Sequence, residues 1–232
     1  MSRPAPRKRR TPEEARSEIL AAAQRLLAAH GPDAIGLKDV AKEAGVSHAL
    51  VSHYFGTYDA LVEAALREHM IVTRAETLAR ITDVVHAGPR GWVDMTFEHL
   101  AHPLSGRLVA WSILSGRMER DDFFPRRDQG MKLVADALEA RVRAELGDDA
   151  PPREEIERAM LLVFSAALGY SLARGVLWSS LSREPTAERD RDFREWLAGV
   201  VSESLPAARA LAARSSDGAA PVKKRSAKKK AR

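Results

Sequence analysis

The stretch LKDVAKEAGVSHALVSHYF, residues 37–55, contains two short segments that can form helices on either side of Gly45. Val40 and Ala41 are the expected inward positions of the first segment, and a glycine after it can adopt the left-handed conformation that ends a helix. Ser47 is a preferred helix N-cap, and the segment HALVSHYF that follows it fits a second helix. Two short helices joined by a tight glycine turn are typical of a helix-turn-helix, whose second helix lies in the DNA major groove.

Longer helices are predicted on both sides of this stretch. Upstream, Thr11 fits an N-cap, Pro12 the first helical position and Glu14 the capping box. The helix that begins there should end near His30-Gly31-Pro32. Its apolar positions recur at intervals of three and four, namely Ile19, Leu20, Ala23, Leu26 and Leu27. Downstream of the Gly56-Thr57 turn, a long helix is expected from about Tyr58 to Val85.

The rest of the chain has helical periodicity and no strand-like alternation, which predicts an all-α protein. Residues 75–210 should form five or six further helices, because Gly and Pro pairs interrupt the pattern and Pro151 and Pro152 can open a long helix to about Trp178. We therefore expect an N-terminal three-helix helix-turn-helix domain, residues 11–72 with the motif at about 36–55. A larger helical domain is expected at residues 73–210.

Charge is distributed unevenly along the 232 residues. Residues 1–10 hold five basic and no acidic side chains, and residues 215–232 hold seven basic and one acidic, which leaves 25 basic and 31 acidic residues between 11 and 214. Both tails are too polar to bury an apolar face, so we expect 1–10 and 211–232 to be disordered. They are either solubilising ends or cationic arms that approach a polyanion.

Composition also excludes several classes of site. The chain has no cysteine, which fits a reducing compartment and excludes disulfides and thiolate chemistry. Its first thirty residues lack the apolar core of a signal peptide, and no long apolar run suggests a membrane segment, so we expect a cytoplasmic protein. His48 and His53 are five residues apart and therefore point in different directions on a helix, which disfavours a metal site. A surface helix cannot supply the pocket that Ser, His and Asp59 would need for catalysis, so we expect no catalytic residues and no cofactor.

The pattern VA..AGVS....HYFG..DAL, with I.AA..L....G upstream, resembles the DNA-binding domain of tetracycline-repressor-type regulators, the TetR family. The resemblance covers about residues 11–70. It implies a DNA-binding transcriptional regulator, in which Tyr54 matches a phosphate-binding tyrosine and Lys38 is the nearest phosphate ligand on the first helix of the motif. The DNA contacts that it implies are Lys38, Ser47, His48, Ala49, Leu50, Ser52, His53, Tyr54, Thr57 and Tyr58.

The chain departs from the family pattern where fixed positive charge is usual. Tyr58 stands where the family often has a lysine, and Leu37 stands where Thr or Ser often opens the first helix of the motif. Only five basic residues accompany nine acidic ones between 11 and 70. We therefore expect an N-terminal arm to contact phosphates or the minor groove, through Arg7, Lys8, Arg9 and Arg10.

The resemblance implies that the C-terminal segment, residues 73–210, is an effector-binding and dimerisation domain. Small residues in MLLVFSAALGYSLARGVLW allow helices to approach closely, either as a buried core helix or, as the resemblance implies, in a four-helix dimer interface with FREWLAGVVSESL. The resemblance also implies a small-molecule effector of unknown identity. Its candidate pocket residues, which are otherwise core residues, are Trp92, Phe97, Trp111, Met118, Phe123 and Phe124.

These observations together predict a repressor that binds a palindromic operator in double-stranded DNA as a homodimer and is released by a small molecule. The alternative is an effector-independent DNA-organising protein, in which the basic tails supply affinity for any sequence.

Overall fold

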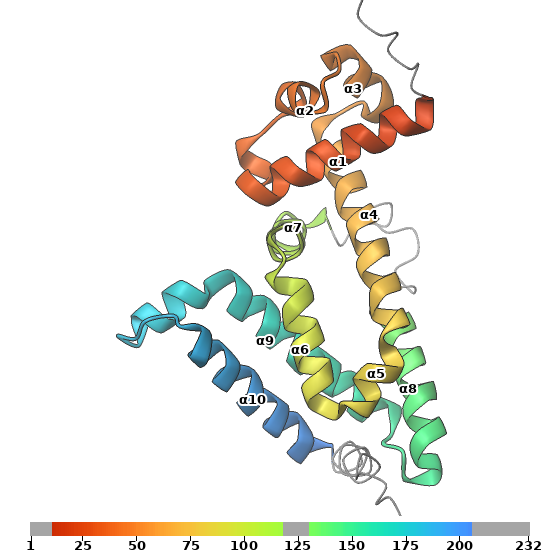
Figure 1. The fold of residues 1–232 in the computed structure, drawn as a ribbon, viewed down its shortest axis with the longest axis vertical. Helices are drawn as coiled ribbons and strands as arrows, with labels where there is room; N and C mark the ends of the chain where they lie inside the picture. The colour runs from red at the N-terminus through yellow and green to blue at the C-terminus, as the bar shows by residue number, and fades with distance from the viewer. Residues whose placement is uncertain (1–10, 118–129, 206–232) are drawn as a thin grey trace, which may run out of the picture.

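Every regular element in residues 11–117 and 130–205, the ranges that the computed structural model describes, is helical (Figure 1). The elements are α1 (Pro12–His30), η1 (Pro32–Ala34), α2 (Leu37–Ala44), α3 (His48–Phe55), α4 (Tyr58–Ala79), α5 (Ile81–His86), α6 (Gly88–Ala101), α7 (Pro103–Leu114), α8 (Met131–Leu146), η4 (Gly147–Asp149), α9 (Arg153–Ser180) and α10 (Ala187–Ser204). The all-α prediction is confirmed.

Helix α1 begins and ends where its sequence predicts. The Thr11 hydroxyl accepts the Glu14 amide at 3.2 Å, and the Glu14 carboxylate accepts the Thr11 amide at 2.9 Å, so both halves of a capping box are present. Gly31, at φ 81°, ends the helix. Four of the five predicted apolar positions are buried, whereas Leu26 is half-buried at the edge of the same core.

Helix α4 is shorter than predicted, because it ends at Ala79 and not near Val85. Arg80 terminates it with φ −94° and ψ 0°, and α5 then continues in a new direction. The turn allows Val84 and Val85 to be buried, Val85 against Val142 of α8. Tertiary packing of these valines therefore overrides a helical periodicity that would have allowed a single long helix.

The core of the N-terminal domain is completed by a helix from the segment expected to form the C-terminal domain. Helix α7 packs against α1 and α4, and its Leu104, Leu108 and Val109 are buried in the same cluster as Ile19 and Leu66. Helix α4 runs from this cluster down to α5 and α8, as Figure 1 shows. The expected boundary at residue 72 thus falls inside α4, which is shared by both parts.

The C-terminal part is built around α6, which packs against α5, α9 and α10. Phe97 of α6, Tyr170 of α9 and Leu197 of α10 belong to its buried core. The two prolines Pro151 and Pro152 precede α9, which ends two residues after the predicted Trp178.

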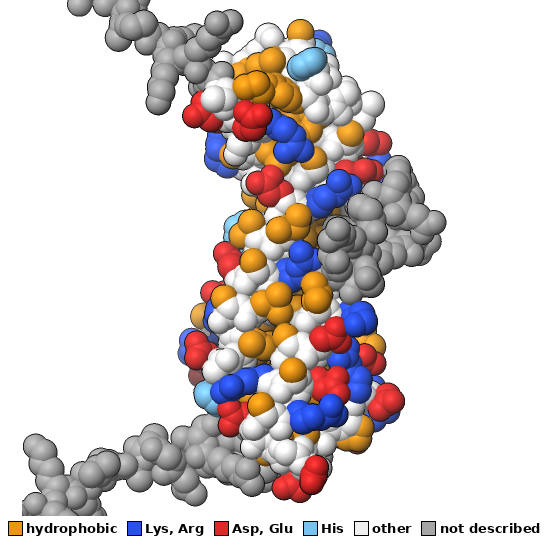
Figure 2. Space-filling view, turned by 90° about the vertical axis from the view of Figure 1, so that its right-hand side faces the viewer, with side chains coloured by type: hydrophobic (Ala, Val, Ile, Leu, Met, Phe, Trp, Pro, Cys, Tyr) orange, Lys and Arg blue, Asp and Glu red, His pale blue; other side chains and the backbone are white. Residues whose placement is uncertain are grey.

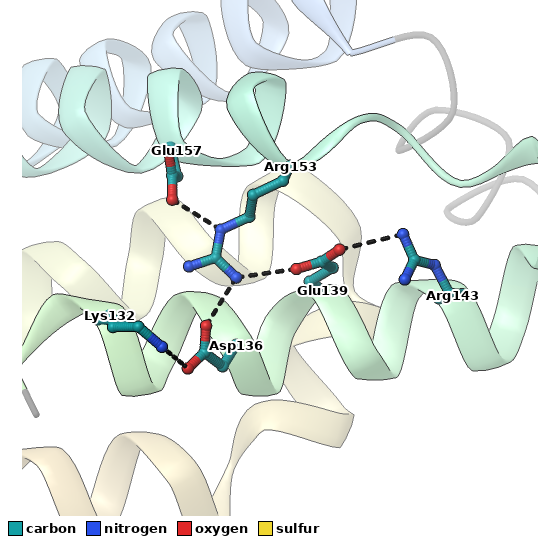
Figure 3. Close-up of polar contacts among 6 residues, drawn as sticks. All are labelled: Lys132, Asp136, Glu139, Arg143, Arg153 and Glu157. Atoms are coloured by element: carbon teal, nitrogen blue, oxygen red, sulfur yellow. Dashed lines mark hydrogen bonds and ion pairs between the residues drawn. The ribbon is translucent and has the colours of Figure 1, made fainter. Parts of the chain in front are cut away.

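An ion-pair network fastens the start of α9 to α8 (Figure 3). The Arg153 guanidinium lies 2.8 Å from the Asp136 carboxylate and 2.9 Å from that of Glu139, both on α8, and 2.7 Å from that of Glu157 on its own helix. Hydrogen bonds from Lys132 and Arg153 lower the pKa of Asp136. Isolated exposed ion pairs contribute little to stability, but Arg153 is only 24% exposed and fixes three carboxylates at once.

Candidate nucleic-acid interface

The turn between α2 and α3 has the geometry that its sequence predicts. Gly45 adopts the left-handed conformation, with φ 64° and ψ 35°, and its N–H donates to the carbonyls of the last turn of α2. The Val46 N–H donates to the Ala41 carbonyl at 3.0 Å, which continues the same cap. At the other end of α2 the Asp39 carboxylate accepts the Gly36 N–H at 2.9 Å. Both ends of this short helix are therefore fixed.

Helix α3 is anchored by its cap and by one apolar face. The Ser47 hydroxyl accepts the Leu50 N–H at 3.2 Å, as predicted for an N-cap. Val51 and Phe55 are buried in the domain core, and Leu50 and Tyr54 are half-buried against it. The helix therefore has little freedom to rotate, which fixes the side chains on its opposite face.

The outward face of α3 consists of small and hydrogen-bonding groups. His48, Ala49 and His53 are exposed, and Ser52 is partly exposed. The Tyr54 ring meets the His53 ring edge to face, with centroids 5.4 Å apart. This face lies at the end of the molecule formed by α2 and α3, where Figure 2 shows histidine side chains. Such groups suit base edges, thymine methyls and phosphate oxygens.

Thr57 and Tyr58, which follow the Gly56 turn, make different hydrogen bonds within the chain. The Thr57 hydroxyl accepts the Ala60 N–H at 3.1 Å and so caps α4. Tyr58, expected to face DNA in place of a lysine, instead donates its hydroxyl to the Pro32 carbonyl at 2.6 Å. Burial and the nearby Asp33 carboxylate raise the pKa of Tyr58 to about 12. Its proton is thus committed to an internal contact, which no local sequence pattern reveals, because the two residues are 26 positions apart.

Positive charge on this end of the described structure comes from few side chains. Lys38 and Lys42 are exposed on α2, but Arg25 of α1 is paired with Glu43 at 2.9 Å. Arg16 of α1 lies over the Phe55 ring at 5.2 Å, close to the end of α3. Sequence reasoning missed Arg16, whose proximity to α3 depends on the crossing of two helices. The predicted arm Arg7, Lys8, Arg9 and Arg10 lies outside the described residues.

The three predicted effector residues that the structure describes do not gather at one site. Trp92 lines an apolar cavity of about 70 Å³ between α5, α6, α8, α9 and α10. Phe97 does not line this cavity and packs beside Tyr170, with ring centroids 5.8 Å apart. Trp111 lies under the Arg117 guanidinium at 4.3 Å, near the start of α4. Three further candidates, Met118, Phe123 and Phe124, lie outside the described residues.

A face of α9 and α10 exposes large apolar side chains. Its exposed members, which we call the α9–α10 face and which include Leu181 directly after α9, are Leu161, Leu162, Leu172, Val176, Leu177, Leu181 and Trp196. By length and composition alone α9 is long and apolar enough to cross a membrane, and only 22% of its most apolar window is buried in this chain. An apolar surface of this kind on a folded chain marks an interaction site.

No group of three or more His, Cys, Asp or Glu side chains suited to a metal ion occurs within residues 11–117 and 130–205. His48 and His53 point outward from α3, as the motif geometry requires.

Comparisons with known proteins agree with this geometry. Residues 19–65 match the family described as bacterial regulatory proteins, tetR family. The HTH-type transcriptional repressor Rv3405c of Mycobacterium tuberculosis is 31% identical over 169 residues, which cover 70% of this chain and 79% of the relative. The uncharacterized HTH-type transcriptional regulator Rv1255c of the same species is 38% identical over 152 residues, covering 63% and 70%.

Among solved structures, a transcriptional regulator from Streptomyces coelicolor, SCO4942, superposes with a TM-score of 0.56 at 24% identity. The match covers 83% of this chain and 98% of that one, so the helical arrangement is shared along nearly all of that protein.

Proposed function

Because this chain belongs to the tetR family of bacterial transcriptional regulators, which bind DNA, we propose that it is a repressor that binds a palindromic operator as a homodimer and leaves it when a small molecule binds. The observation that most supports this proposal is α3 itself. The helix is capped by Ser47, anchored by Val51 and Phe55, and presents His48, Ala49, Ser52 and His53 at an exposed end of the molecule.

Base contacts and phosphate contacts divide between different side chains of this surface. His48, Ala49, Ser52 and His53 face outward along α3 and are proposed to contact base edges. Ser47, Leu50, Tyr54 and Thr57, at the ends and flank of α3, and Lys38 on α2 are proposed to position the helix through the backbone. For Tyr58 we propose at most an accepting role, because its hydroxyl proton is bonded to Pro32.

The homodimer is supported by the α9–α10 face. Val176 and Leu181 are 70% and 67% exposed, and Trp196 is 63% exposed, although all three are apolar. Pairing this face with its copy would bury these side chains and form a four-helix interface. Two-fold symmetry would then place two recognition helices about one DNA turn apart, roughly 34 Å, which matches a palindromic operator.

Repression and its release are supported by two further observations. The relative Rv3405c of Mycobacterium tuberculosis is named a repressor, and that name describes the relative alone. In this chain α4 begins in the core of the DNA-binding domain, with Leu61 and Leu66, and ends beside α5 and α8 next to the cavity. A shift of α5 would therefore be transmitted to the motif through one continuous helix. The proposed regulator acts in the cytoplasm and needs no enzymatic step and no cofactor.

A footprint tests the proposal against a DNA-organising role. The full-length protein is bound to genomic fragments that include the region upstream of its own gene, and protection is mapped with and without residues 215–232. We expect one protected palindrome that survives removal of the tail. Even protection along the DNA that disappears with the tail would contradict the regulator and support the organiser.

A further inference from the structure

The turn between α6 and α7 is capped by the side chain of a histidine. His102 has φ −61° and ψ 126°, the extended backbone to which a residue before proline is restricted. Pro103 has no N–H, so the first free donor of α7 is the Leu104 N–H, which donates to the His102 Nδ1 at 3.3 Å. An imidazole nitrogen accepts a hydrogen bond only when it carries no proton. This cap therefore requires a neutral His102.

The capped amide belongs to a core residue of the DNA-binding domain. The Leu104 side chain is 3% exposed and is buried in the same cluster as Ile19 of α1 and Leu66 of α4. Figure 1 shows α7 between the upper end of α6 and α1. The cap thus acts on the turn that inserts α7 into this core.

A second histidine, from α4, contacts the same turn. The His69 ring stacks on the His102 ring, with centroids 5.3 Å apart, and its Nε2 lies 2.5 Å from the Oγ of the buried Ser105. Burial, and next the charge of a protonated His102, lower the pKa of His69. Two protonated rings at this distance repel each other. The closed junction therefore favours neutral imidazoles.

Other ionisable groups near the pair come from α4, α6 and α7. Glu76 of α4 raises the pKa of His69 and His99 of α6 lowers it, and both act less than burial and His102. Glu76 also lies 3.9 Å from the His99 Nε2. Glu68 of α4 and Arg107 of α7 are exposed, so solvent screens their charges.

Helices α1 and α9, which also pack against α7, bring apolar side chains to this cluster. The two arginines of α1 are directed elsewhere, Arg25 to Glu43 and Arg16 to the Phe55 ring. Its three glutamates are exposed. On α9, no charged residue occurs between residues 158 and 174. The groups of this junction that change charge between pH 5 and 8 are therefore its histidines.

We propose that the α6–α7 junction is a proton-operated switch of operator binding. While His69 and His102 are neutral, α7 is docked in the core of the DNA-binding domain. Proton uptake by the exposed His102 removes the acceptor for the Leu104 N–H and places a positive charge at a helix N-terminus, where the helix dipole disfavours it. The first turn of α7 is then released. The release depends on the junction alone, whereas its effect on DNA rests on the proposed function.

The expected size follows from these two interactions. Loss of an N-cap shifts a helix equilibrium by about 2- to 30-fold. A cation at a helix N-terminus shifts it by about 2- to 5-fold more in the same direction. The docking equilibrium should therefore fall by roughly 4- to 150-fold when His102 is protonated. Operator binding weakens about 3-fold once two thirds of the molecules are released.

The release is measured first on the full-length protein without DNA. Amide hydrogen exchange of Leu108 and Val109 in α7 is recorded at pH 7.5 and pH 5.5 and expressed as protection factors, which correct for the intrinsic effect of pH. We expect these factors to fall by at least about 4-fold at pH 5.5, while that of Val163 in α9 stays constant. In His102→Asn, which keeps a preferred N-cap that does not titrate, all of them should stay constant.

A fall in Leu108 and Val109 protection that is equally large in His102→Asn, or no fall in the wild type, would refute the switch. Equal loss of protection at Val163 would show global unfolding and would refute it as well. His102→Ala removes the cap at every pH. It should therefore show at pH 7.5 the low protection in α7 that the wild type shows at pH 5.5, and wild-type protection in this variant would contradict the role of the cap.

The effect on DNA is measured by operator affinity at the same two pH values and one salt concentration. His48 and His53 are present in both proteins, so their protonation near phosphates cancels when the wild type is compared with His102→Asn. We expect the ratio of Kd at pH 5.5 to Kd at pH 7.5 to be at least about 3-fold larger in the wild type. His86→Asn, the same substitution in a histidine of α5 that pairs with Glu145, should keep the wild-type ratio.

The two measurements separate the switch from the proposed function. Release of α7 at pH 5.5 with equal Kd ratios in the wild type and His102→Asn would support the junction and contradict its control of operator binding. Release of α7 in a protein that prefers no operator would contradict the proposed function and leave the junction supported.

Discussion

A single charge on the α9–α10 face should separate the proposed homodimer. Val176 is 70% exposed in one chain, so a two-fold interface over this face would bury most of its side chain. Val176→Asp removes about 1 kcal/mol or more of apolar burial from each protomer and adds about 1 to 3 kcal/mol for a polar group taken out of water. Both copies change together, which gives at least about 4 kcal/mol per dimer and a roughly 1,000-fold weaker association.

Sedimentation velocity over a range of protein concentrations measures this change directly. The matched control is Val72→Asp on α4, where the same substitution replaces a valine that is 49% exposed and does not belong to the α9–α10 face. We expect the wild type and Val72→Asp to sediment as dimers where Val176→Asp sediments as a monomer, with equal helical content by circular dichroism. A Val176→Asp protein that stays dimeric at every concentration would refute the interface.

Three further predictions concern stability, pH and salt. Asp190→Ala removes the carboxylate that accepts a hydrogen bond from the Tyr170 hydroxyl at 2.6 Å. It should lower the free energy of unfolding by about 2 to 3 kcal/mol and the melting temperature by roughly 4 to 12 °C. An unchanged melting curve would contradict this prediction. Burial lowers the pKa of His69 below its ordinary value of 6.5, because the charged imidazolium is disfavoured in the folded chain. The contribution of His69 to folding stability is therefore complete above pH 6.5 and is lost as the pH falls through the lowered pKa. Urea unfolding of His69→Gln should show a shallower dependence of stability on pH, and the same dependence as in the wild type would contradict this prediction. Deleting residues 1–10 should flatten the slope of log K against log salt for operator binding by roughly 3 to 4 units, and an unchanged slope would show that the arm does not contact phosphate.

The elements that sequence predicts best are those defined by local signals. The capping box at Thr11, the left-handed Gly45 and the Ser47 cap each depend on residues within four positions of one another, and all three are present. The outward face of α3 follows from the same information, because burying Val51 and Phe55 leaves His48, Ala49 and His53 exposed and Ser52 partly exposed. Their contacts with DNA stay a prediction.

The features that sequence reasoning missed depend on residues far apart in the chain. The packing of Val84 and Val85 against other helices ends α4 at Ala79, although the periodicity continues. The Tyr58 hydroxyl reaches Pro32 because α1 and α4 lie side by side in the domain core. Likewise, α7 lies beyond the expected boundary at residue 72 and yet fills the core of the DNA-binding domain. Such contacts come from how helices cross and leave no periodic trace in the sequence.

The prediction of the effector pocket shows the same limit. The sequence does not reveal which aromatic residues at helical spacing pack in the core and which line a cavity. Of the predicted residues that the structure describes, only Trp92 lines the cavity. Phe97 packs against Tyr170 and Trp111 against Arg117. The buried indole N–H of Trp92, which has no hydrogen-bond partner among the described residues, could be found only in the structure.

The claim that α3 determines operator choice is tested most directly by selecting DNA from a random duplex pool with the full-length protein at fixed ionic strength. The selection is repeated with His48→Ala/Ser52→Ala/His53→Ala and with the control Lys132→Ala, a remote residue of α8 that pairs with Asp136. We predict that the wild type and the control enrich the same palindrome, whereas the triple variant still binds DNA but enriches no sequence. Enrichment of the same palindrome by the triple variant would contradict the assignment of α3 as the recognition helix.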